Sequence, residues 1–451
     1  MHIIAIPILP EEKHSRLDGL KHPALLQGLA LLPVIYWFCQ RLNDGSDEPL
    51  GLLTLLLALV LAWRDRSSLS AGKSARIGGA VLILMSVIGI LVLPPMLRAG
   101  LAVAGVAMSY GIHQKSGLLG LIMLSLPVTA SMQFYLGYPL RVVAAEGTIR
   151  LLELGHIVAF RSGTQIELNG KIMGVDPACS GVRMLWHALV AAMALAAIHR
   201  LTWRATVISA VFAIVLVIPA NILRAALLVA KETGNLKGMF FDHGGVGLVS
   251  FAVILVPLAL AISSRARRQM TVGSFARSGG SERFLLVLAI VLIPCLTYAS
   301  RCNPKPSHSG TMPTIFTFDG LTLPLLPLPS SPAEIAFSEK FPGFLSSYQW
   351  GTDQVILRRV NEATRRLHSS GDCLRAAGFE ITDAITETRS DGSKWARFHA
   401  SRDGVRWAVH ERIISEQDGS SWTDVSAWFW SALRRPLNGP WQAETVIRRF
   451  F

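Results

Sequence analysis

Charged residues are scarce in this sequence: Asp, Glu, Lys and Arg make up 16% of the 451 residues, whereas apolar residues make up 51%. Ordinary globular domains contain about 25% charged residues. The mean hydropathy, +0.43, is correspondingly high. This shortage of charge excludes a soluble globular protein and directs attention to membrane-spanning segments.

Cysteine is also scarce, and its spacing does not suggest metal binding. The five cysteines form no CxxC pair and no Cys/His cluster with the spacing of metal ligands; they are Cys39, Cys179, Cys295, Cys302 and Cys373. A zinc site and a disulfide scaffold are therefore unsupported, and we expect no metal and no cofactor. No small-residue cleavage site follows the first apolar block, which we interpret as a retained span rather than a signal peptide.

Long apolar blocks, in contrast, are frequent. They are about 15–25 residues long, which is the length that an α-helix needs to cross a bilayer. The fourth block is short enough to be re-entrant. The sequence predicts an all-α polytopic membrane domain over residues 1–299, with about nine transmembrane helices. The blocks cover residues 24–39, 49–63, 77–97, 100–112, 117–136, 181–199, 205–230, 244–263 and 284–299.

The positive net charge indicates orientation in the membrane. The formal charge is +13, from 43 Lys and Arg against 30 Asp and Glu. In a soluble protein this excess would suggest nucleic acid, but here it flanks the apolar blocks, so we expect contact with membrane lipids and no nucleic acid. With the N-terminus in the cytoplasm, the basic segments 13–21, 64–76 and 265–283 all lie on the cytoplasmic side. The prediction is a multi-pass protein of the cell inner membrane.

One segment between predicted spans has the pattern of a surface element. Residues 138–178 begin with an amphipathic stretch typical of an interfacial helix. Gly163 and Asn169-Gly170 then separate short apolar/polar alternations. We therefore predict a small hairpin that lies on the outer membrane surface.

The C-terminal tail, residues 300–451, is polar and opens with a Pro/Ser-rich linker. Alternating residues on both sides of Asp403-Gly404 predict a hairpin. Helices are predicted over residues 355–367 and 425–433. The tail is therefore expected to be a separate, soluble α+β domain on the extracytoplasmic side.

Polar residues at the rim of a span are costly and are the first candidates for a site. Cys179 precedes the sixth predicted span, Arg224 lies in the outer half of the seventh with Asn221 one turn earlier, and His243 precedes the eighth. A thiol at a helix start is suited to nucleophilic attack. A histidine transfers protons near neutral pH, and an arginine can stabilise an oxyanion. Their convergence at one face predicts a thiol acyl-transfer site.

Each of these residues also has a simpler explanation. A cysteine at the end of a span is often a small packing residue, and an arginine there can extend its guanidinium to the lipid headgroups. An isolated loop histidine is uninformative. A small-molecule transporter is a further alternative, in which Arg224 holds an anion, but such sites usually lie near the bilayer midplane between inverted repeats. Neither feature is found here.

At these residues the sequence resembles the exosortase/archaeosortase family of integral membrane proteins, over roughly residues 125–262. The resemblance is carried by Ala178-Cys179-Ser180-Gly181, Asn221-Ile222-Leu223-Arg224 and His243, in that order. It implies that Cys179, Arg224 and His243 are catalytic. The residues Ser180, Gly181 and Asn221 match motif positions with supporting or substrate-binding roles. Asp176-Pro177 departs from the commonest pattern, in which an acidic residue lies nearer the cysteine.

The resemblance implies a function as well as a site. A sortase-like cysteine protease or transpeptidase would act at the extracytoplasmic face, through a Cys thioester. Its partners would be secreted client proteins with a C-terminal sorting signal, which consists of a short motif, an apolar helix and a basic cluster. The rival function is a non-catalytic membrane component of exopolysaccharide biosynthesis or export, and that machinery is a further candidate partner.

The tail carries a second, shorter resemblance. Its segment 368–379, with His368, Cys373-Leu374 and Gly378, looks like the His…Cys-Leu…Gly segment of a polysaccharide-associated protein family that is often encoded beside, or fused to, exosortases. This similarity marks His368 and Cys373 as a candidate second site. A packed cysteine and a Cys302–Cys373 disulfide remain alternatives.

Overall fold

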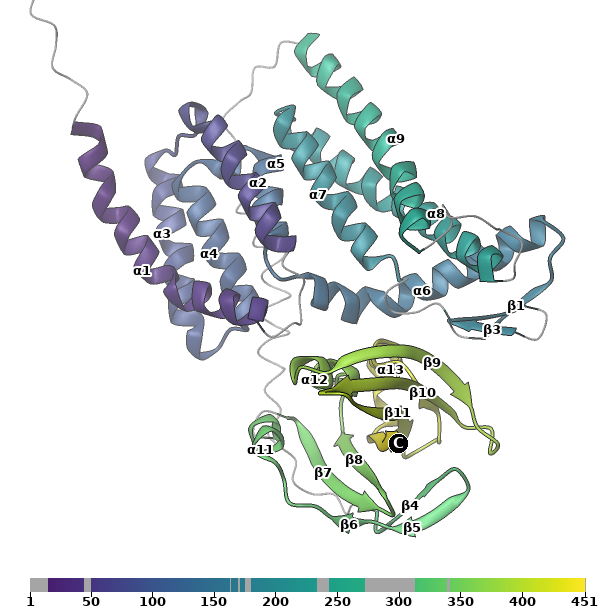
Figure 1. Ribbon diagram of the computed structural model, residues 1–451. Coiled ribbons are helices and arrows are strands. Elements are labelled where there is room, and N and C mark those ends of the chain that lie inside the picture. The colour runs from purple at the N-terminus through teal and green to yellow at the C-terminus, as the bar shows by residue number, and fades with distance from the viewer. Residues whose placement is uncertain are drawn as a thin grey trace, which may run out of the picture.

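The computed structural model describes residues 15–43, 50–162, 164–168, 171–174, 180–232, 243–271, 313–338 and 341–450, and the description below concerns these residues. The N-terminal part is helical (Figure 1). Its helices are α1 (Ser15–Asn43), α2 (Leu50–Arg64), α3 (Lys73–Ile88), α4 (Pro95–Ser109), α5 (Ser116–Leu124), α6 (Thr129–Leu154), α7 (Val182–Ile198), α8 (Trp203–Glu232) and α9 (His243–Thr271).

The helices pack through small residues. Gly79 of α3 and Gly105 of α4 approach so closely that a Cβ on Gly105 would lie 2.7 Å from the Gly79 carbonyl oxygen. Alanines such as Ala104, Ala188 and Ala213 are buried in the shared core, while many large apolar side chains are exposed. Close helix contact together with an apolar exterior is typical of helices that pack in a bilayer.

Two helices are long and apolar enough to cross a membrane, Trp203–Lys231 and Gly245–Arg267, and α5 with α6 would add a third if the pair is one span. Shorter apolar helices cover Gly51–Arg64, Pro95–Ser109 and Val182–Ile198. The helical, apolar N-terminal region is thus confirmed. Within the described residues, however, the helices do not bear out about nine spans, and the predicted block 284–299 lies outside those residues.

The predicted fifth span, residues 117–136, is wrong as a single straight helix. The chain forms α5 and then continues as α6 at 89° to it. Pro127 explains the break, because proline lacks an N–H and disfavours helical backbone for the residue before it. Ser125 Oγ donates to the Ile122 carbonyl at 2.7 Å in the last turn of α5. A helix perpendicular to α5 can run along a membrane surface instead of through it.

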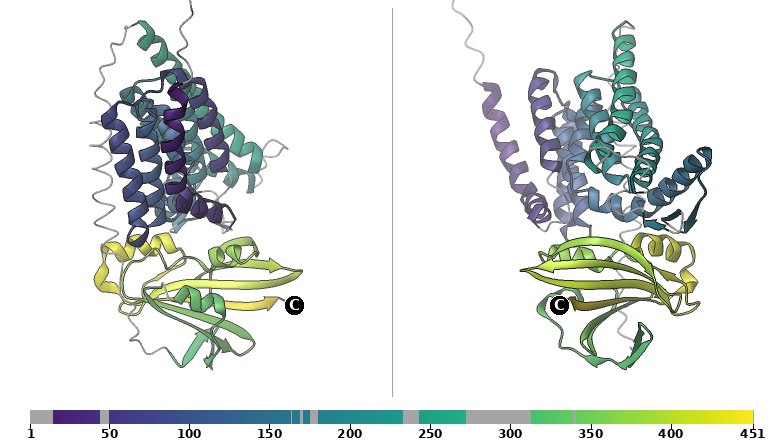
Figure 2. Two further views of the ribbon diagram at one scale, coloured as in Figure 1. Left: turned by 90° about the vertical axis from the view of Figure 1, so that its left-hand side faces the viewer. Right: turned by 45° about the vertical axis from the view of Figure 1, so that its right-hand side comes forward.

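α6 lies across one end of the bundle, and a small sheet follows it (Figures 1 and 2). β1 (Ala159–Ser162), β2 (Gln165–Leu168) and β3 (Lys171–Gly174) form a three-stranded antiparallel meander. Ile166 and Leu168 of β2 pack on Ile149 and Leu152 of α6. The predicted helix and hairpin over residues 138–178 are confirmed as elements, with one more strand than a hairpin has.

The described C-terminal part is rich in β-strands. β4 (Ile315–Phe318) pairs with β5 (Leu321–Pro324), and an eight-stranded antiparallel sheet follows in the order β6-β7-β8-β13-β11-β10-β9, with β12 beside β11. Its strands are β6 (Leu326–Pro327), β7 (Gly343–Trp350), β8 (Asp353–Val360), β9 (Glu380–Thr388), β10 (Lys394–Arg402), β11 (Val405–Ser415), β12 (Ser421–Trp422) and β13 (Trp441–Phe450). Three helices accompany it, α11 (Pro332–Ser338), α12 (Ser370–Ala376) and α13 (Val425–Arg434).

The local predictions in the tail had different outcomes. The hairpin at Asp403-Gly404 is confirmed as the β10–β11 turn, where both residues have positive φ, 52° and 78°. The helix at 425–433 is confirmed as α13. The helix predicted over 355–367 is wrong, because residues 355–360 belong to β8, a strand paired on both sides, and the rest of the segment forms turns. The β-branched Val355, Ile356 and Val360 favour a strand, and tertiary pairing decides the outcome.

The tail packs directly against α6, which the sequence did not predict (Figure 2). Trp430 Nε1 of α13 donates to the Tyr135 carbonyl at 2.8 Å, and Arg365 donates to Ser131 Oγ at 2.7 Å. The Phe134 ring of α6 meets the Phe429 ring edge-on, with centroids 5.1 Å apart. α6 therefore has the helical bundle on one side and the tail on another.

Candidate functional site

The predicted catalytic residues differ in how much of them can be described. Cys179 and Asp176-Pro177 lie outside the described residues, and for His243 only its backbone position at the start of α9 is described. Arg224 and the supporting residues Ser180, Gly181 and Asn221 are described fully. The site is therefore built from the residues that surround Cys179 in sequence and from α8.

Gly181 brings the start of α7 against α8. It has a left-handed backbone, φ 82°, at the cap of α7. A Cβ at this position would lie 2.8 Å from both Cγ and Nδ2 of Asn221. Only glycine suits both the backbone conformation and the contact. The segment that immediately follows Cys179 is thus held against the buried Asn221 side chain.

Ser180 connects the same segment to α6. Its hydroxyl donates to Gln133 Oε1 at 3.0 Å and accepts the Val182 backbone N–H at 3.3 Å. The sequence analysis missed Gln133. The signal that could have found it is an amide side chain within the mainly apolar block 117–136, because polar residues in such blocks often mark sites.

α6 also crosses α8 beside the candidate residues. Gly147 of α6 leaves room for the Ile222 side chain, which would contact a Cβ there, and Thr148 Oγ1 donates to the Ile222 carbonyl at 3.5 Å. Ile222 directly follows Asn221. One turn of α8 therefore contacts both the start of α7 and the middle of α6.

Arg224 lies one helical turn after Asn221, on the same side of α8. Arg224 is partly buried as a whole. Its Nε atom is fully buried and has no hydrogen-bond partner among the described residues. A partly buried guanidinium with a donor to spare can bind a carbonyl oxygen or stabilise an oxyanion. Arg224 is thus a candidate donor to such an oxygen.

The start of α9 belongs to the same half of the bundle. α8 ends and α9 begins in the half that faces α6 and the tail (Figure 1), and α9 contacts both α7 and α8. The structure thus brings together Ser180, Gly181, Asn221 and Arg224. For His243, only the backbone position is described, and it lies at the start of α9. Within the described parts of the chain, no group of three or more His, Cys, Asp or Glu could hold a metal ion.

The candidate second site in the tail is a Cys–His pair. Cys373 Sγ lies 2.9 Å from His368 Nε2, and His368 Nδ1 lies 2.9 Å from the Arg366 carbonyl. Because a carbonyl oxygen only accepts, Nδ1 carries the proton and Nε2 accepts the S–H. Arg358 holds this loop by donating to the His368 carbonyl at 2.7 Å.

Desolvation keeps this pair neutral. Although Cys373 reaches the surface as a free cysteine, the protein atoms around it raise the pKa of its thiol by burial. Burial and then the Arg358 charge lower the pKa of His368. The pair is therefore a thiol and an imidazole near neutral pH, rather than a thiolate and an imidazolium. Cys302, its predicted alternative partner, lies outside the described residues.

Comparison with known proteins identifies a related family. A family model described as transmembrane exosortase (Exosortase_EpsH) matches residues 42–260. The matched stretch runs from the end of α1 into α9, so it includes Cys179, Asn221, Arg224 and His243, while the tail lies outside it. Neither a curated protein nor a solved structure matches the chain.

Proposed function

We propose that this chain, which belongs to the transmembrane exosortase family through residues 42–260, is a cysteine protease or transpeptidase that cleaves C-terminal sorting signals of secreted proteins. The family supports a membrane protein with a role in sorting or processing. The observation that carries the finer proposal is the packing of Ser180-Gly181 against Asn221, one turn from the available Arg224 guanidinium.

The proposed mechanism assigns one step to each residue. The Cys179 thiolate attacks a peptide carbonyl of the client and forms a thioester. Arg224 donates to the developing oxyanion, for which its buried Nε has no competing partner among the described residues. His243 protonates the leaving amine, and later activates the water or amine that releases the client.

The proposed topology puts this chemistry at the extracytoplasmic face of the inner membrane, on the same side as the tail. Its support is a continuous set of contacts. Gln133 of α6 binds Ser180, and neighbouring residues of α6, Tyr135 and Ser131, bind the tail. A site and a domain that share one surface helix lie on one side of the membrane. About nine spans, with the N-terminus in the cytoplasm, remain part of this proposal.

The experiment follows client size by immunoblot in a strain that lacks the native enzyme and carries each variant. Cys179→Ala should abolish processing, because no neighbouring group replaces the nucleophile. Arg224→Lys should also reduce it severely, since an ammonium is a point charge and lacks the planar fork of donors. The matched controls are Cys39→Ala, at an exposed cysteine of α1, and Arg204→Lys, at an exposed arginine near the start of α8. Both should process clients normally.

Undiminished processing by Cys179→Ala would end the covalent mechanism. The chain would then fit the non-catalytic role in exopolysaccharide biosynthesis or export. Normal processing by Arg224→Lys, with Cys179→Ala inactive, would leave the thioester in place and restrict Arg224 to a contribution of charge.

A further inference from the structure

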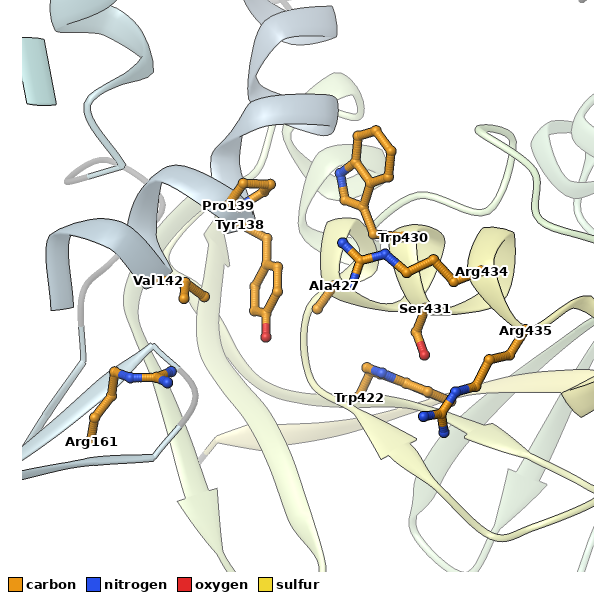
Figure 3. Close-up of a pocket in the computed structure, with 10 residues that line it drawn as sticks. All are labelled: Tyr138, Pro139, Val142, Arg161, Trp422, Ala427, Trp430, Ser431, Arg434 and Arg435. Carbon is orange, nitrogen blue, oxygen red and sulfur yellow. The ribbon is translucent and has the colours of Figure 1, made fainter. Parts of the chain in front are cut away.

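A cleft of about 670 Å³ opens between α6, β1 and the tail (Figure 3). It lies where α13 docks against α6, and the proposed mechanism does not use it. Its lining combines aromatic rings with arginines: Tyr138 of α6, Arg161 of β1, Trp422 of β12, and Trp430, Arg434 and Arg435 from α13 and the residue after it.

The charge in this cleft is of one sign. Its lining contains arginines but no acidic residue. Arg161 is paired with Glu146 at 3.0 Å, whereas Arg434 and Arg435 are exposed. Within the described residues, no ion pair or side-chain hydrogen bond engages either of these two. A guanidinium presents a planar fork of donors that matches phosphate and carboxylate oxygens. The cleft is thus suited to an anion.

Exposed apolar residues neighbour the cleft arginines along the chain. Leu437 is 85% exposed and Leu433 is 50% exposed, on either side of the two free arginines. At the other side of the cleft, Phe160 and Val158 precede Arg161 in sequence and are 66% and 69% exposed. Large exposed apolar side chains close to a polar cleft are typical of a surface that meets another apolar phase. A purely soluble anion would satisfy the arginines and leave these side chains in water.

The position of the cleft identifies that phase. α6 stands at 89° to α5 and crosses the end of a bundle whose long helices are apolar enough to span a membrane, so it lies along the membrane surface. Tyrosine and tryptophan, which line the cleft, are the residues enriched where membrane and water meet. The arginines therefore lie near the level of the lipid headgroups.

We propose that this cleft binds the phosphate group of an anionic phospholipid. Arg434 and Arg435 engage the phosphate, and the acyl chains run past the exposed apolar residues of the β1 segment and of the segment that follows α13. One lipid would then contact both the membrane domain and the tail, and so hold the tail on α6. This site is independent of the chemistry proposed at Cys179.

The test uses the full chain in phosphatidylcholine nanodiscs that contain fluorescent phosphatidylglycerol as the probe. Arg434→Gln/Arg435→Gln should weaken phosphatidylglycerol binding tenfold or more. Leu437→Asp should weaken it as well, and this side chain is too exposed to be needed for folding. The matched control is Arg375→Gln/Arg406→Gln, which removes two exposed tail arginines outside the cleft and should leave binding unchanged.

Competition distinguishes the sources of the anion. Unlabelled phosphatidylglycerol should displace the probe, while inorganic phosphate and a soluble acidic peptide should not do so at the same concentration. Wild-type binding by Arg434→Gln/Arg435→Gln, or equal weakening in the control pair, would overturn the proposal. So would displacement by the acidic peptide, which would make the cleft a site for a soluble partner. Because the readout is lipid binding, a failure here leaves client cleavage unaffected.

Discussion

At the scale of single residues, Gly181 connects the sequence motif to the geometry of the site. Its left-handed backbone and its contact with Asn221 both require the absence of a Cβ. In Gly181→Ala, the backbone conformation alone costs about 1–2 kcal/mol, and the contact adds strain. We expect a lower thermal unfolding temperature together with reduced client processing.

The control for this prediction is Gly247→Ala in α9, where a Cβ would meet nothing within 4 Å. Alanine is favoured over glycine in a helix by up to about 1 kcal/mol, so this variant should be at least as stable as the native chain. Equal stability of both variants would mean that the start of α7 does not need its close approach to α8.

A second residue-scale prediction concerns the thiol of Cys373. Burial raises its pKa, so the folded state favours the neutral thiol, and any stability that this provides is lost as the pH rises through the thiol pKa. At pH 7 the folded chain should react with iodoacetamide at Cys373 several-fold more slowly than the unfolded chain. Peptide mass spectrometry measures the rate at this position. Faster reaction in the folded chain would indicate a thiolate beside an imidazolium, and a more reactive second site than the geometry suggests.

At the scale of elements, the outcomes of the sequence predictions have physical causes. α13 could be predicted because it carries local signals: Asp424 accepts the Ala427 N–H at 2.8 Å as its cap, and an apolar face follows. β8 could not be predicted, because it is stabilised by pairing with β7 and β13, and β13 lies far from it in sequence. The turn after α5 had a local signal in Pro127, but hydropathy averaged over the block concealed it.

The residues of the candidate site also divide into those with a local sequence signal and those whose role depends on tertiary contacts. Cys179, Arg224 and His243 stand out in the sequence because polar residues at the rims of apolar blocks are rare. Gln133 was missed because its role depends on α6 crossing the bundle, which the sequence did not predict. The contacts between the tail and α6 join residues far apart in the chain, and no local pattern encodes them.

The element-scale prediction tests the contact between α6 and α13. Arg141 forms an ion pair with Asp424, and the Arg141 side chain is 6% exposed. Asp424→Asn keeps a good helix cap but leaves a buried arginine unpaired, which typically costs about 3–5 kcal/mol. We expect the tail to separate from α6, with faster proteolysis at the contact surface.

The double variant Arg141→Gln/Asp424→Asn removes both charges and should recover much of the resistance to protease, because no unpaired charge remains buried. Asp372→Asn is the matched control, since its pair with Arg375 is exposed on both sides. If Asp424→Asn were as resistant as this control, the ion pair would not hold the two parts together.

At the scale of the whole molecule, the catalytic candidates all lie before the tail, and the family match also ends before the tail begins. A chain that ends at residue 299 should therefore insert stably and retain some cleavage of an overexpressed client. Cleavage should be weaker than in the full chain, because α6 loses its contacts to Trp430 and Arg365 while Gln133 of the same helix still binds Ser180. Quantitative immunoblotting measures the extent of client cleavage and the amount of truncated enzyme in the membrane. Complete loss of cleavage in a stably inserted truncated chain, with equal loss in Cys373→Ala, would instead place part of the chemistry in the tail and make the Cys373–His368 pair its centre.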